Sequence, residues 1–444
     1  MHRRSRARWL ALAGIGATLG LAAGPADARY TMCALRSGPE GPCTCRAPED
    51  GVGQFTAVDR SFCRRGAKAA KGKPAVVKPA ASGAAAAAPA TGPTVSNAPD
   101  AADAAAAAKP SAAATSPASA TTTSALPPAT MRLDAVRSRG KLTCGVNPGL
   151  LGFAHRTASG EWAGMDVDFC RAVAVATLGD ASKVEFVPLD ATQRFDALKA
   201  STIDLLSRNT TWTMSRDVDL GLEFVGVLYF DGQSFLTSDE RGLVSAQQLA
   251  GARVCVQAAT TTEANMAYYF KSHAMTAETR SFNSREDLVK AYLDGTCDAY
   301  TADRSSLFSD RAGFDEPLRH VVLPEVISKE PLGPAVLQGD LEWTEIVRWT
   351  LAGLINAEEV GLDKAAAGTE ASLTGDAQRL LDGAAASGGH LRLDKDWLRG
   401  VIASVGNYGE MFEANIGKAS PLGMDRGINA LWKKGGILYA PPMW

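Results

Sequence analysis

The segment Ser207–Asp217, with sequence SRNTTWTMSRD, gathers side chains suited to holding a small anion. It follows a short apolar run, Ile203–Leu206, that is typical of a buried strand. Hydroxyl and amide groups at the end of a strand, together with exposed backbone N–H groups, can donate hydrogen bonds to a carboxylate. Arg216 adds a planar guanidinium, which binds a carboxylate through two parallel charge-assisted bonds. A polar loop with a surface arginine explains the same residues equally well, so this segment alone leaves both hypotheses open.

A second polar cluster, Thr260–Glu263, follows the apolar run Arg253–Gln257 and begins a predicted helix. A threonine with a glutamate three residues later is typical of a capping box, which places Thr260 at the helix start. One hypothesis is that Thr260, Thr261 and Thr262 only cap this helix. In the other, the free N–H groups and the positive dipole end of the helix bind a carboxylate.

Two further side chains could complete a ligand site. Asp303 lies two residues after a predicted strand that ends at Thr301. Its carboxylate either pairs with a ligand ammonium or is a solvated loop residue, which is the commoner case for an isolated aspartate. Phe153 follows a glycine-rich turn and either covers the aliphatic part of a ligand or packs into the first lobe.

Taken together, these residues describe a site for a zwitterion. Arg216 and the helix N-terminus at Thr260 would hold a carboxylate, Asp303 would hold an ammonium, and Phe153 would cover the remainder of the ligand. Because buried charges are tolerated only when they are paired, such a site would discriminate against ligands that lack either group.

The elements that must position these side chains alternate between strands and helices. The first unit predicts strands at Leu142–Val146, Val184–Leu189 and Ile203–Leu206, with helices at Phe169–Leu178 and Thr192–Ala200. Asp166 and Asp168 stand where an N-cap for the first helix belongs, and Phe195 and Leu198 are expected to face inward in the second. The second unit predicts strands at Arg253–Gln257, Cys297–Thr301 and Val321–Val326, with helices from Thr260 through Phe270 and at Asp287–Leu293.

Beyond residue 340 the pattern becomes helical. Asp340 is expected to cap an amphipathic helix whose core-facing residues are Trp343, Ile346, Val347, Leu351, Leu354 and Ile355. We therefore predict an α/β fold with two lobes, parallel or mixed sheets and two hinge crossings. Residues 131–230 begin lobe 1, residues 231–328 form lobe 2, and residues 329–444 return to lobe 1 and add the helical C-terminal part. Ligands of such sheets bind beyond the carboxyl ends of the strands, here in the cleft between lobes.

The eight cysteines divide evenly between an N-terminal segment and the main body. Cys144 with Cys170, and Cys255 with Cys297, would each join two elements of one lobe, whereas a bond between lobes would block hinge motion. Loop closure over such spans contributes about 3.5 to 4 kcal/mol each. Cys33, Cys43, Cys45 and Cys63 also favour disulfides, because the spacing of Cys43 and Cys45 does not fit a zinc site. Their pairing is left open.

The N-terminal region carries export signals. Residues 1–28 combine a basic start, an apolar run and a small-residue cleavage site after Ala28, which is typical of a signal peptide. Residues 29–63 form a cysteine-bearing segment, and residues 64–130 are an Ala/Pro-rich stretch without aromatic residues, which predicts a disordered linker. We therefore expect a periplasmic protein.

Composition excludes several classes of function. A formal charge of -2 and a pI near 6.3 give no basic face for nucleic acid. No GxxxxGK[ST] loop is present, and no pattern calls for a metal or an organic cofactor. We expect a monomer.

From Met131 to Trp444 the chain resembles the general L-amino-acid-binding proteins of bacterial ABC uptake systems. These belong to the polar amino-acid branch of the periplasmic solute-binding proteins. The motifs that carry the resemblance are LTCGVNPGLLGF, GMDVDFCRAVA, LLSRNTTWTMSRD, VCVQAATTTEAN, CDAYTADRSSL, VISKEPLGPAV, VGNYGEMFEANIG, RGINALW and GGILYAPP. The resemblance implies a type II periplasmic-binding-protein fold that closes around an L-amino acid and delivers it to a membrane permease.

The resemblance also implies roles for individual residues. Arg216, with Thr261 and Thr262, would hold the α-carboxylate, and Asp303 would hold the α-ammonium. The assisting and covering residues would be Asn209, Thr211 and Phe153. The chain departs from the family pattern where glycine is usual and Ala259 stands, and where phenylalanine is usual and Met165 stands. The Cβ of Ala259 is expected to crowd the loop before Thr260, and Arg208 and Trp212 could narrow the specificity.

Two other classes of function stay open. Periplasmic cyclohexadienyl and arogenate dehydratases share this scaffold, although the chain shows no GxSxG, HExxH or histidine near the site motifs. A scaffold held in the cell envelope by residues 29–130 is the third hypothesis. The binding protein is the interpretation that we favour.

Overall fold

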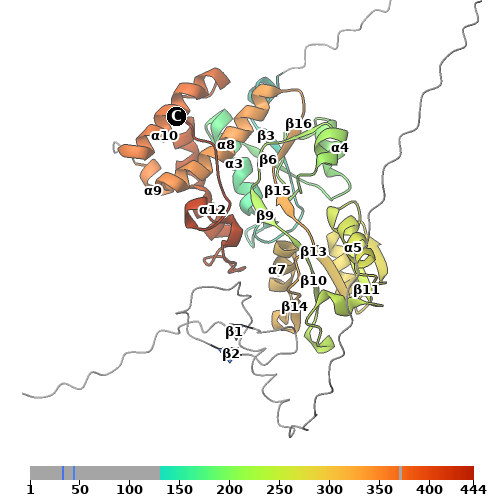
Figure 1. Ribbon diagram of the computed structural model, residues 1–444. Helices are drawn as coiled ribbons and strands as arrows, with labels where there is room; N and C mark the ends of the chain where they lie inside the picture. Colours follow the sequence, from blue (N-terminus) through green and yellow to red (C-terminus); the bar gives the residue numbers. More distant parts are fainter. Residues whose placement is uncertain (1–32, 35–43, 46–130, 370–372) are drawn as a thin grey trace, which may run out of the picture. The chain divides into compact units, whose positions relative to one another are not determined.

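The computed structural model describes residues 33–34, 44–45, 131–369 and 373–444 of the chain (Figure 1). The predicted signal peptide and the linker lie outside the described residues, as do the side chains of the four N-terminal cysteines. In the N-terminal unit, residues 1–116, two short strands are described. Strand β1 (Cys33–Ala34) pairs with β2 (Thr44–Cys45) in antiparallel fashion.

The first lobe is built on a five-stranded mixed sheet in the order β6-β3-β7-β16-β8. Its strands are β3 (Leu142–Val146), β6 (Val184–Pro188), β7 (Leu205–Leu206), β8 (Leu222–Phe224) and β16 (Ala335–Leu337). Strand β3 runs parallel to β6 and β7, whereas β16 is antiparallel to β7 and β8. The helices of this lobe are α2 (Arg132–Arg139), α3 (Met165–Leu178) and α4 (Arg194–Lys199), with a small hairpin of β4 (His155–Arg156) and β5 (Trp162–Ala163).

The second lobe repeats this plan with the order β12-β11-β13-β10-β14. Its strands are β10 (Gln233–Ser238), β11 (Arg253–Gln257), β12 (Glu278–Phe282), β13 (Ala299–Asp303) and β14 (His320–Val322). Strand β11 is parallel to β12 and β13, and β10 is antiparallel to β13 and β14. The helices are α5 (Thr261–Ser272), α6 (Arg285–Leu293) and α7 (Arg304–Ala312). The expected strand over 321–326 is shorter than predicted, because Pro324 supplies no N–H for a ladder.

Two short strands carry the chain between the lobes. Strand β9 (Tyr229–Asp231) leads into lobe 2, and β15 (Glu330–Leu332) leads back; the two pair antiparallel, with Glu330 opposite Asp231 (Figure 1). This confirms the predicted α/β architecture of two lobes joined by two crossings.

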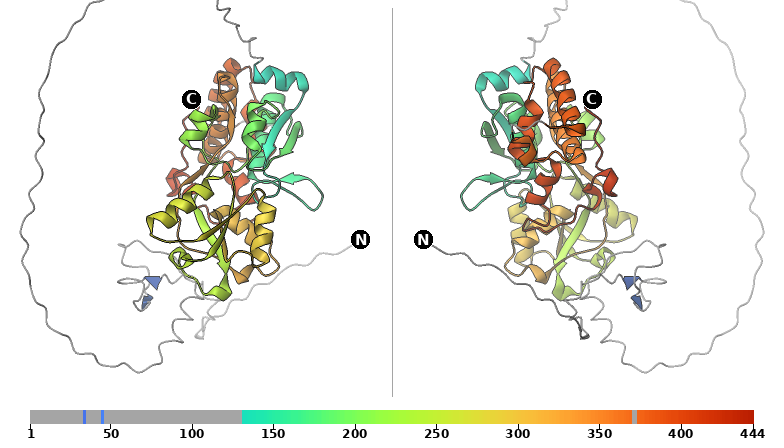
Figure 2. Two further views of the ribbon diagram at one scale, coloured as in Figure 1. Left: turned by 90° about the vertical axis from the view of Figure 1, so that its right-hand side faces the viewer. Right: turned by 90° about the vertical axis from the view of Figure 1, so that its left-hand side faces the viewer.

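Helices complete lobe 1 at the C-terminal end of the chain (Figure 2). They are α8 (Leu341–Val360), α9 (Lys364–Ala367), α10 (Gly375–Gly388), α11 (Trp397–Val405) and α12 (Tyr408–Asn415). All six residues predicted to face the core from α8 are buried, and Asp340 caps that helix by accepting the Trp343 N–H at 2.9 Å. Single turns of 3-10 helix lie at Asp239–Arg241, Ala246–Leu249, Pro317–Arg319, Gly389–Leu391, Gly427–Asn429 and Trp432–Lys434. None of the helices described combines the length and the apolar character needed to cross a membrane.

Helix α3 begins at Met165, four residues earlier than predicted. Its N-cap is Gly164, whose φ of +131° is a conformation that side chains disfavour. A Cβ at Gly164 would also lie 2.1 Å from the carbonyl oxygen of Phe153. Asp166 does not cap the helix, because its carboxylate accepts hydrogen bonds from the Ser207 hydroxyl and the Asn209 N–H.

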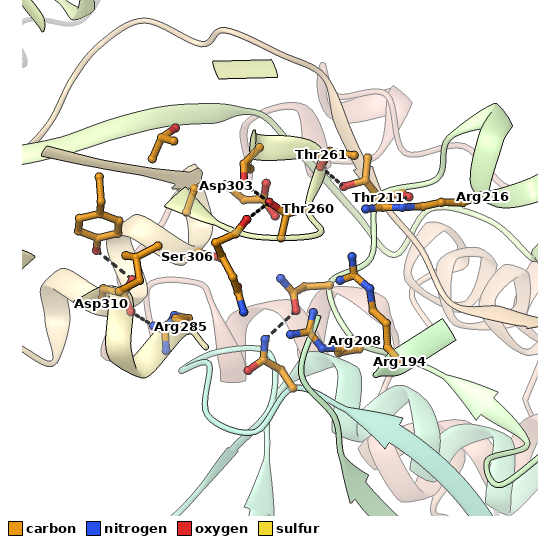
Figure 3. A pocket seen from close by; sticks show the side chains of 18 residues that line it. Arg194, Arg208, Thr211, Arg216, Thr260, Thr261, Arg285, Asp303, Ser306 and Asp310 are labelled. Atoms are coloured by element: carbon orange, nitrogen blue, oxygen red, sulfur yellow. Dashed lines mark hydrogen bonds and ion pairs between the residues drawn. The ribbon is translucent and has the colours of Figure 1, made fainter. Parts of the chain in front are cut away.

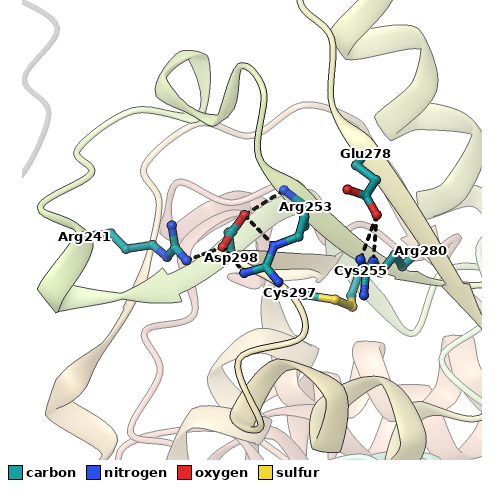
Figure 4. Close-up of a disulfide and its surroundings, with 7 residues drawn as sticks. All are labelled: Arg241, Arg253, Cys255, Glu278, Arg280, Cys297 and Asp298. Carbon is teal, nitrogen blue, oxygen red and sulfur yellow. Dashed lines mark hydrogen bonds and ion pairs between the residues drawn. A yellow bond between two sulfur atoms is a disulfide. The ribbon is translucent and has the colours of Figure 1, made fainter.

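Both predicted disulfides of the main body are confirmed. Cys144–Cys170 joins β3 to α3, and Cys255–Cys297 joins β11 to the segment before β13 (Figure 4). Asp298, next to Cys297, accepts hydrogen bonds from the backbone and guanidinium of Arg253, and these hold its pKa at about 2. The disulfide and this ion pair together fix the outer end of the lobe 2 sheet.

Ala259 adopts a left-handed conformation with φ of +58° in the loop between β11 and α5. Its side chain is exposed and does not line the cavity described below, so it does not crowd that cavity. The expected crowding of the loop backbone before Thr260 stays a prediction. The penalty at Ala259 is conformational, since a left-handed alanine costs roughly 1–2 kcal/mol relative to its preferred conformations.

Replacement of Ala259 by glycine should therefore stabilise the protein, by up to about 1 kcal/mol after the extra chain entropy of glycine is subtracted. Urea denaturation of residues 131–444 measures the change. Ala258→Gly is the matched control, because Ala258 has no positive φ and should lose stability on the same replacement. If Ala259→Gly were no more stable than the parent protein, the conformational penalty assigned to Ala259 would be contradicted.

Candidate functional site

A cavity of about 60 Å³ lies between the two lobes and is lined by side chains from both (Figure 3). One water molecule needs roughly 10–15 Å³ on this measure, so the cavity has room for several waters or a small solute. Seven of the eight predicted ligand residues line it, namely Asn209, Thr211, Arg216, Thr260, Thr261, Thr262 and Asp303.

Phe153, the eighth predicted residue, does not line the cavity. Its side chain is 1% exposed and packs edge-on against Tyr229, with ring centroids 5.3 Å apart, inside the core of lobe 1. The structure thus places Phe153 in the second of its two expected locations, and we do not retain it as a ligand residue. An aromatic side chain after a glycine-rich turn is equally typical of a core position.

Arg216 lies on a single π-helical turn, η1 (Ser215–Asp219), that follows the polar segment. The side chain is buried, and one guanidinium nitrogen, Nη1, donates a hydrogen bond to the Thr211 carbonyl at 2.7 Å. Burial lowers the pKa of Arg216, while the charges of Glu330 and Asp303 act in the opposite direction. Within the described residues its other guanidinium nitrogens form no hydrogen bond, so they can donate to a ligand.

Thr260 stands at the N-cap of α5, as predicted, and its hydroxyl accepts the Glu263 N–H at 3.4 Å. The capping box is not completed, because the Glu263 carboxylate accepts from the Ser281 hydroxyl instead. The first turn, with Thr261 and Thr262, therefore presents N–H groups and the positive end of the helix dipole toward the cavity.

Asp303 ends β13 and occupies the N-cap position of α7. It is 8% exposed, and its Oδ1 atom is buried without a hydrogen-bond partner among the described residues. Burial, followed by the nearby carboxylates of Asp231 and Glu330, raises the pKa of Asp303 well above its usual value. A buried carboxylate oxygen without a partner is costly, so a cationic ligand group at this position would be stabilising.

Asn209 positions the loop of lobe 1 that faces the cavity. Its φ is +32°, its N–H donates to Asp166, and its amide oxygen accepts from Asn147 at 3.0 Å. Burial raises the pKa of Asp166 to about 6, although hydrogen bonds from Ser207 and Asn209 act in the opposite direction. Asn209 is thereby held at the cavity wall by two bonds within lobe 1.

Glu330, which the sequence did not single out, connects both lobes through its carboxylate. It is 1% exposed and lies at the start of the returning strand β15. Its Oε2 accepts hydroxyl hydrogen bonds from Thr211 of lobe 1 at 2.6 Å and from Thr261 of lobe 2 at 2.9 Å. Its Oε1 accepts from the Asn265 amide at 2.7 Å and from the Ser328 hydroxyl.

These bonds fix how the two threonines can face a ligand. A hydroxyl carries one proton, and the protons of Thr211 and Thr261 are both directed at Glu330. The two hydroxyl oxygens, 3.3 Å apart, are therefore left as acceptors toward the cavity.

Three further arginines line the cavity: Arg194, Arg208 and Arg285. Arg285 is ion-paired with Asp310 and also donates to the Gly149 carbonyl of lobe 1 at 2.6 Å. Arg208 had been expected to affect specificity and does line the cavity. Trp212 does not, since its ring stacks on Phe224 with centroids 5.8 Å apart.

To predict that Arg194 and Arg285 line the cavity, one would have to know that the first turns of their two helices lie at the same cleft. Arg194 begins α4 and Arg285 begins α6, and both helices start at the cleft edge of their sheets. In sequence each is one charged residue in a helix, which is most often solvated. Among the described residues no group of histidine, cysteine, aspartate and glutamate side chains is arranged to hold a metal ion.

Comparison with known proteins places the chain in a family. Residues 142–398 match the model of the bacterial extracellular solute-binding proteins, family 3. The general L-amino acid-binding periplasmic protein AapJ of Rhizobium johnstonii is 50% identical over 314 residues, covering 70% of this chain and 92% of the relative. The glutamate/glutamine/aspartate/asparagine-binding protein BztA of Rhodobacter capsulatus is 47% identical over 312 residues, with the same two coverages, 70% and 92%.

A solved structure supports the same assignment. The periplasmic binding protein of an ABC transporter from Brucella ovis, with glutathione bound, is 50% identical and superposes with a TM-score of 0.68. The match covers 70% of this chain and 99% of that one. With a family model matching more than half of the chain and relatives this similar over nearly their whole length, the chain belongs to the bacterial extracellular solute-binding proteins of family 3.

Proposed function

We propose that the protein captures L-amino acids between its two lobes and delivers them to the membrane permease of an ABC transporter. One observation carries the proposal: a single cavity contains the buried guanidinium of Arg216 and the buried, unpartnered carboxylate oxygen of Asp303. A zwitterion satisfies both charges at once. The names of the relatives, which include a general L-amino acid-binding protein, support this ligand class.

Each end of the ligand has a matching set of groups. Arg216 and the first-turn N–H groups of α5 at Thr261 and Thr262 would hold the α-carboxylate. Asp303 would hold the α-ammonium, and the acceptor oxygens of Thr211 and Thr261 would assist it. Asn209 would assist by holding the wall of lobe 1 in place.

Closure of the lobes would complete this site. Arg216 and Thr211 belong to lobe 1, whereas Thr261 and Asp303 belong to lobe 2. An amino acid bound to both would favour the closed arrangement by its differential affinity for it. The closed protein is then the form that a permease would recognise.

Export and partners follow from the same proposal. Cleavage after Ala28 would release a monomer of residues 29–444 into the periplasm, where the relative AapJ resides according to its name. The dehydratase hypothesis is not retained, because the similar proteins are binding proteins rather than enzymes. The three relatives differ in the ligands that their names give, so the breadth of specificity requires direct measurement.

Replacement of Arg216 by alanine should abolish binding of every L-amino acid. The carboxylate would lose its two charge-assisted bonds, and we expect affinity to fall by at least about 100-fold. Calorimetry and thermal shift on residues 131–444, unfolded and refolded first to remove carried-over ligand, measure the change. Lys395→Ala, at a side chain that is 82% exposed, is the control. Normal binding by Arg216→Ala would show that the carboxylate site lies elsewhere.

Replacement of Asp303 by asparagine should weaken amino acids while sparing ligands that lack an ammonium, such as the matching α-hydroxy acids. The pH dependence gives a second readout. Because the pKa of Asp303 is raised in the empty site, its proton competes with the ligand ammonium as the pH falls, and affinity should decrease. This decrease should be absent in Asp303→Asn. Identical affinity and pH dependence in parent and variant would refute the role.

Replacement of Glu330 by glutamine should weaken closure without touching the ligand directly. A neutral amide accepts hydrogen bonds at one atom only, so the bonds from Thr211 and Thr261 compete with those from Asn265. We expect ligand dissociation to accelerate about tenfold or more, with less ligand-induced compaction in small-angle scattering. Glu161→Gln, at an exposed glutamate of lobe 1 that does not line the cavity, is the control. Parental dissociation rate and compaction in Glu330→Gln would argue against this role.

A further inference from the structure

Besides Arg216, two arginines of lobe 1 line the cavity, and neither forms an ion pair with a described residue (Figure 3). Arg194 is 3% exposed, and among residues 131–369 and 373–444 its guanidinium forms neither a hydrogen bond nor an ion pair. Its guanidinium lies over the ring of Phe195, 4.7 Å from the centroid. Arg208 is 4% exposed and donates a hydrogen bond from Nε to the Leu189 carbonyl at 2.8 Å, with no carboxylate at ion-pair distance in the described part of the chain.

The surroundings make this arrangement unfavourable without a ligand. Burial lowers the pKa of Arg194, and the like charges of Arg208 and Arg216 lower it further, with Asp303 offering a smaller attraction. Burial likewise lowers the pKa of Arg208 to about 10, although the charges of Asp166 and Asp190 act in the opposite direction. Buried cations are normally paired, and an isolated one is strongly destabilising. Arg285, which lines the same cavity, is paired in the usual way, because its guanidinium forms an ion pair with the Asp310 carboxylate.

We infer that Arg194 and Arg208 form a second anion subsite, which binds the side-chain carboxylate of an acidic L-amino acid. The inference rests on the proposed function, in which Arg216 and Asp303 hold the α-carboxylate and the α-ammonium. The preferred ligands are then L-glutamate and L-aspartate rather than L-amino acids in general.

The spacing of the guanidiniums fits a ligand with two nearby carboxylates. Arg194 and Arg216 lie against the same Phe195 ring, at 4.7 Å and 5.3 Å from its centroid, so their guanidinium carbons are no more than about 10 Å apart. A short dicarboxylate can contact both. The cavity volume of about 60 Å³ favours a free amino acid over a tripeptide.

The test uses pairs of ligands that differ in one charge. In the parent protein, stripped of ligand by refolding, L-glutamate should bind about 10- to 100-fold more tightly than L-glutamine, and L-aspartate more tightly than L-asparagine. Isothermal calorimetry gives the ratios. In the double variant Arg194→Gln, Arg208→Gln, the glutamate-to-glutamine ratio should fall at least tenfold. Arg156→Gln is the control: it removes an exposed guanidinium of lobe 1 that does not line the cavity, and it should keep the ratio.

Equal affinity for glutamate and glutamine in the parent would overturn the second subsite, even if the double variant failed to fold. A ratio that persists in a folded double variant would overturn it too. Tighter binding of glutathione than of glutamate would contradict the assignment to free amino acids. Failure of the proposed function looks different: no L-amino acid would bind the parent, or Arg216→Ala would bind all of them normally.

Discussion

The buried carboxylate of Glu330 is the interaction that joins the two lobes of this structure. It accepts hydrogen bonds from Thr211 of lobe 1 and from Thr261 and Asn265 of lobe 2, while its own backbone belongs to a crossing strand. A carboxylate can accept from several donors at once, and no neutral side chain matches this capacity. The crossing strand β15 is thus joined through Glu330 to both walls of the cavity. A shift of either lobe would remove hydrogen-bond donors from the buried Glu330 carboxylate.

Charge pairing explains why the cavity is built from so many ionised groups. Arg285 is neutralised by Asp310 within lobe 2, and Glu330 is satisfied by four donors. These groups shape the walls. Asp303 and Arg194 have no such partners among the described residues, and they therefore make the empty cavity unfavourable and favour a ligand of complementary charge. The pattern of satisfied and unsatisfied groups separates the framework from the binding surface.

Much of this site follows from local sequence, and the remainder depends on tertiary contacts. Arg216 and Thr260 were predictable because a strand end and a helix start each place donors at a known edge of a sheet. Glu330 was not, since a single acid in SKEPLG carries no local sign that donors from two lobes converge on it. Phe153 could not be assigned from sequence either, because only the packing against Tyr229 distinguishes a core aromatic from a cover over the ligand.

The direction of the threonine hydroxyls links the hinge to ligand selection. When Thr211 and Thr261 donate to Glu330, their hydroxyl oxygens are left as acceptors. A ligand carboxylate placed beside these two oxygens would therefore meet lone pairs rather than protons. The same two hydroxyls would suit an ammonium. A lobe arrangement that satisfies Glu330 therefore also sets the polarity of the cavity, with carboxylates directed to guanidiniums and backbone N–H groups and the ammonium directed to oxygens. Under the proposed function, closure and recognition of a zwitterion would be one event, because the same two hydroxyl protons bind Glu330 and orient the oxygens of the site.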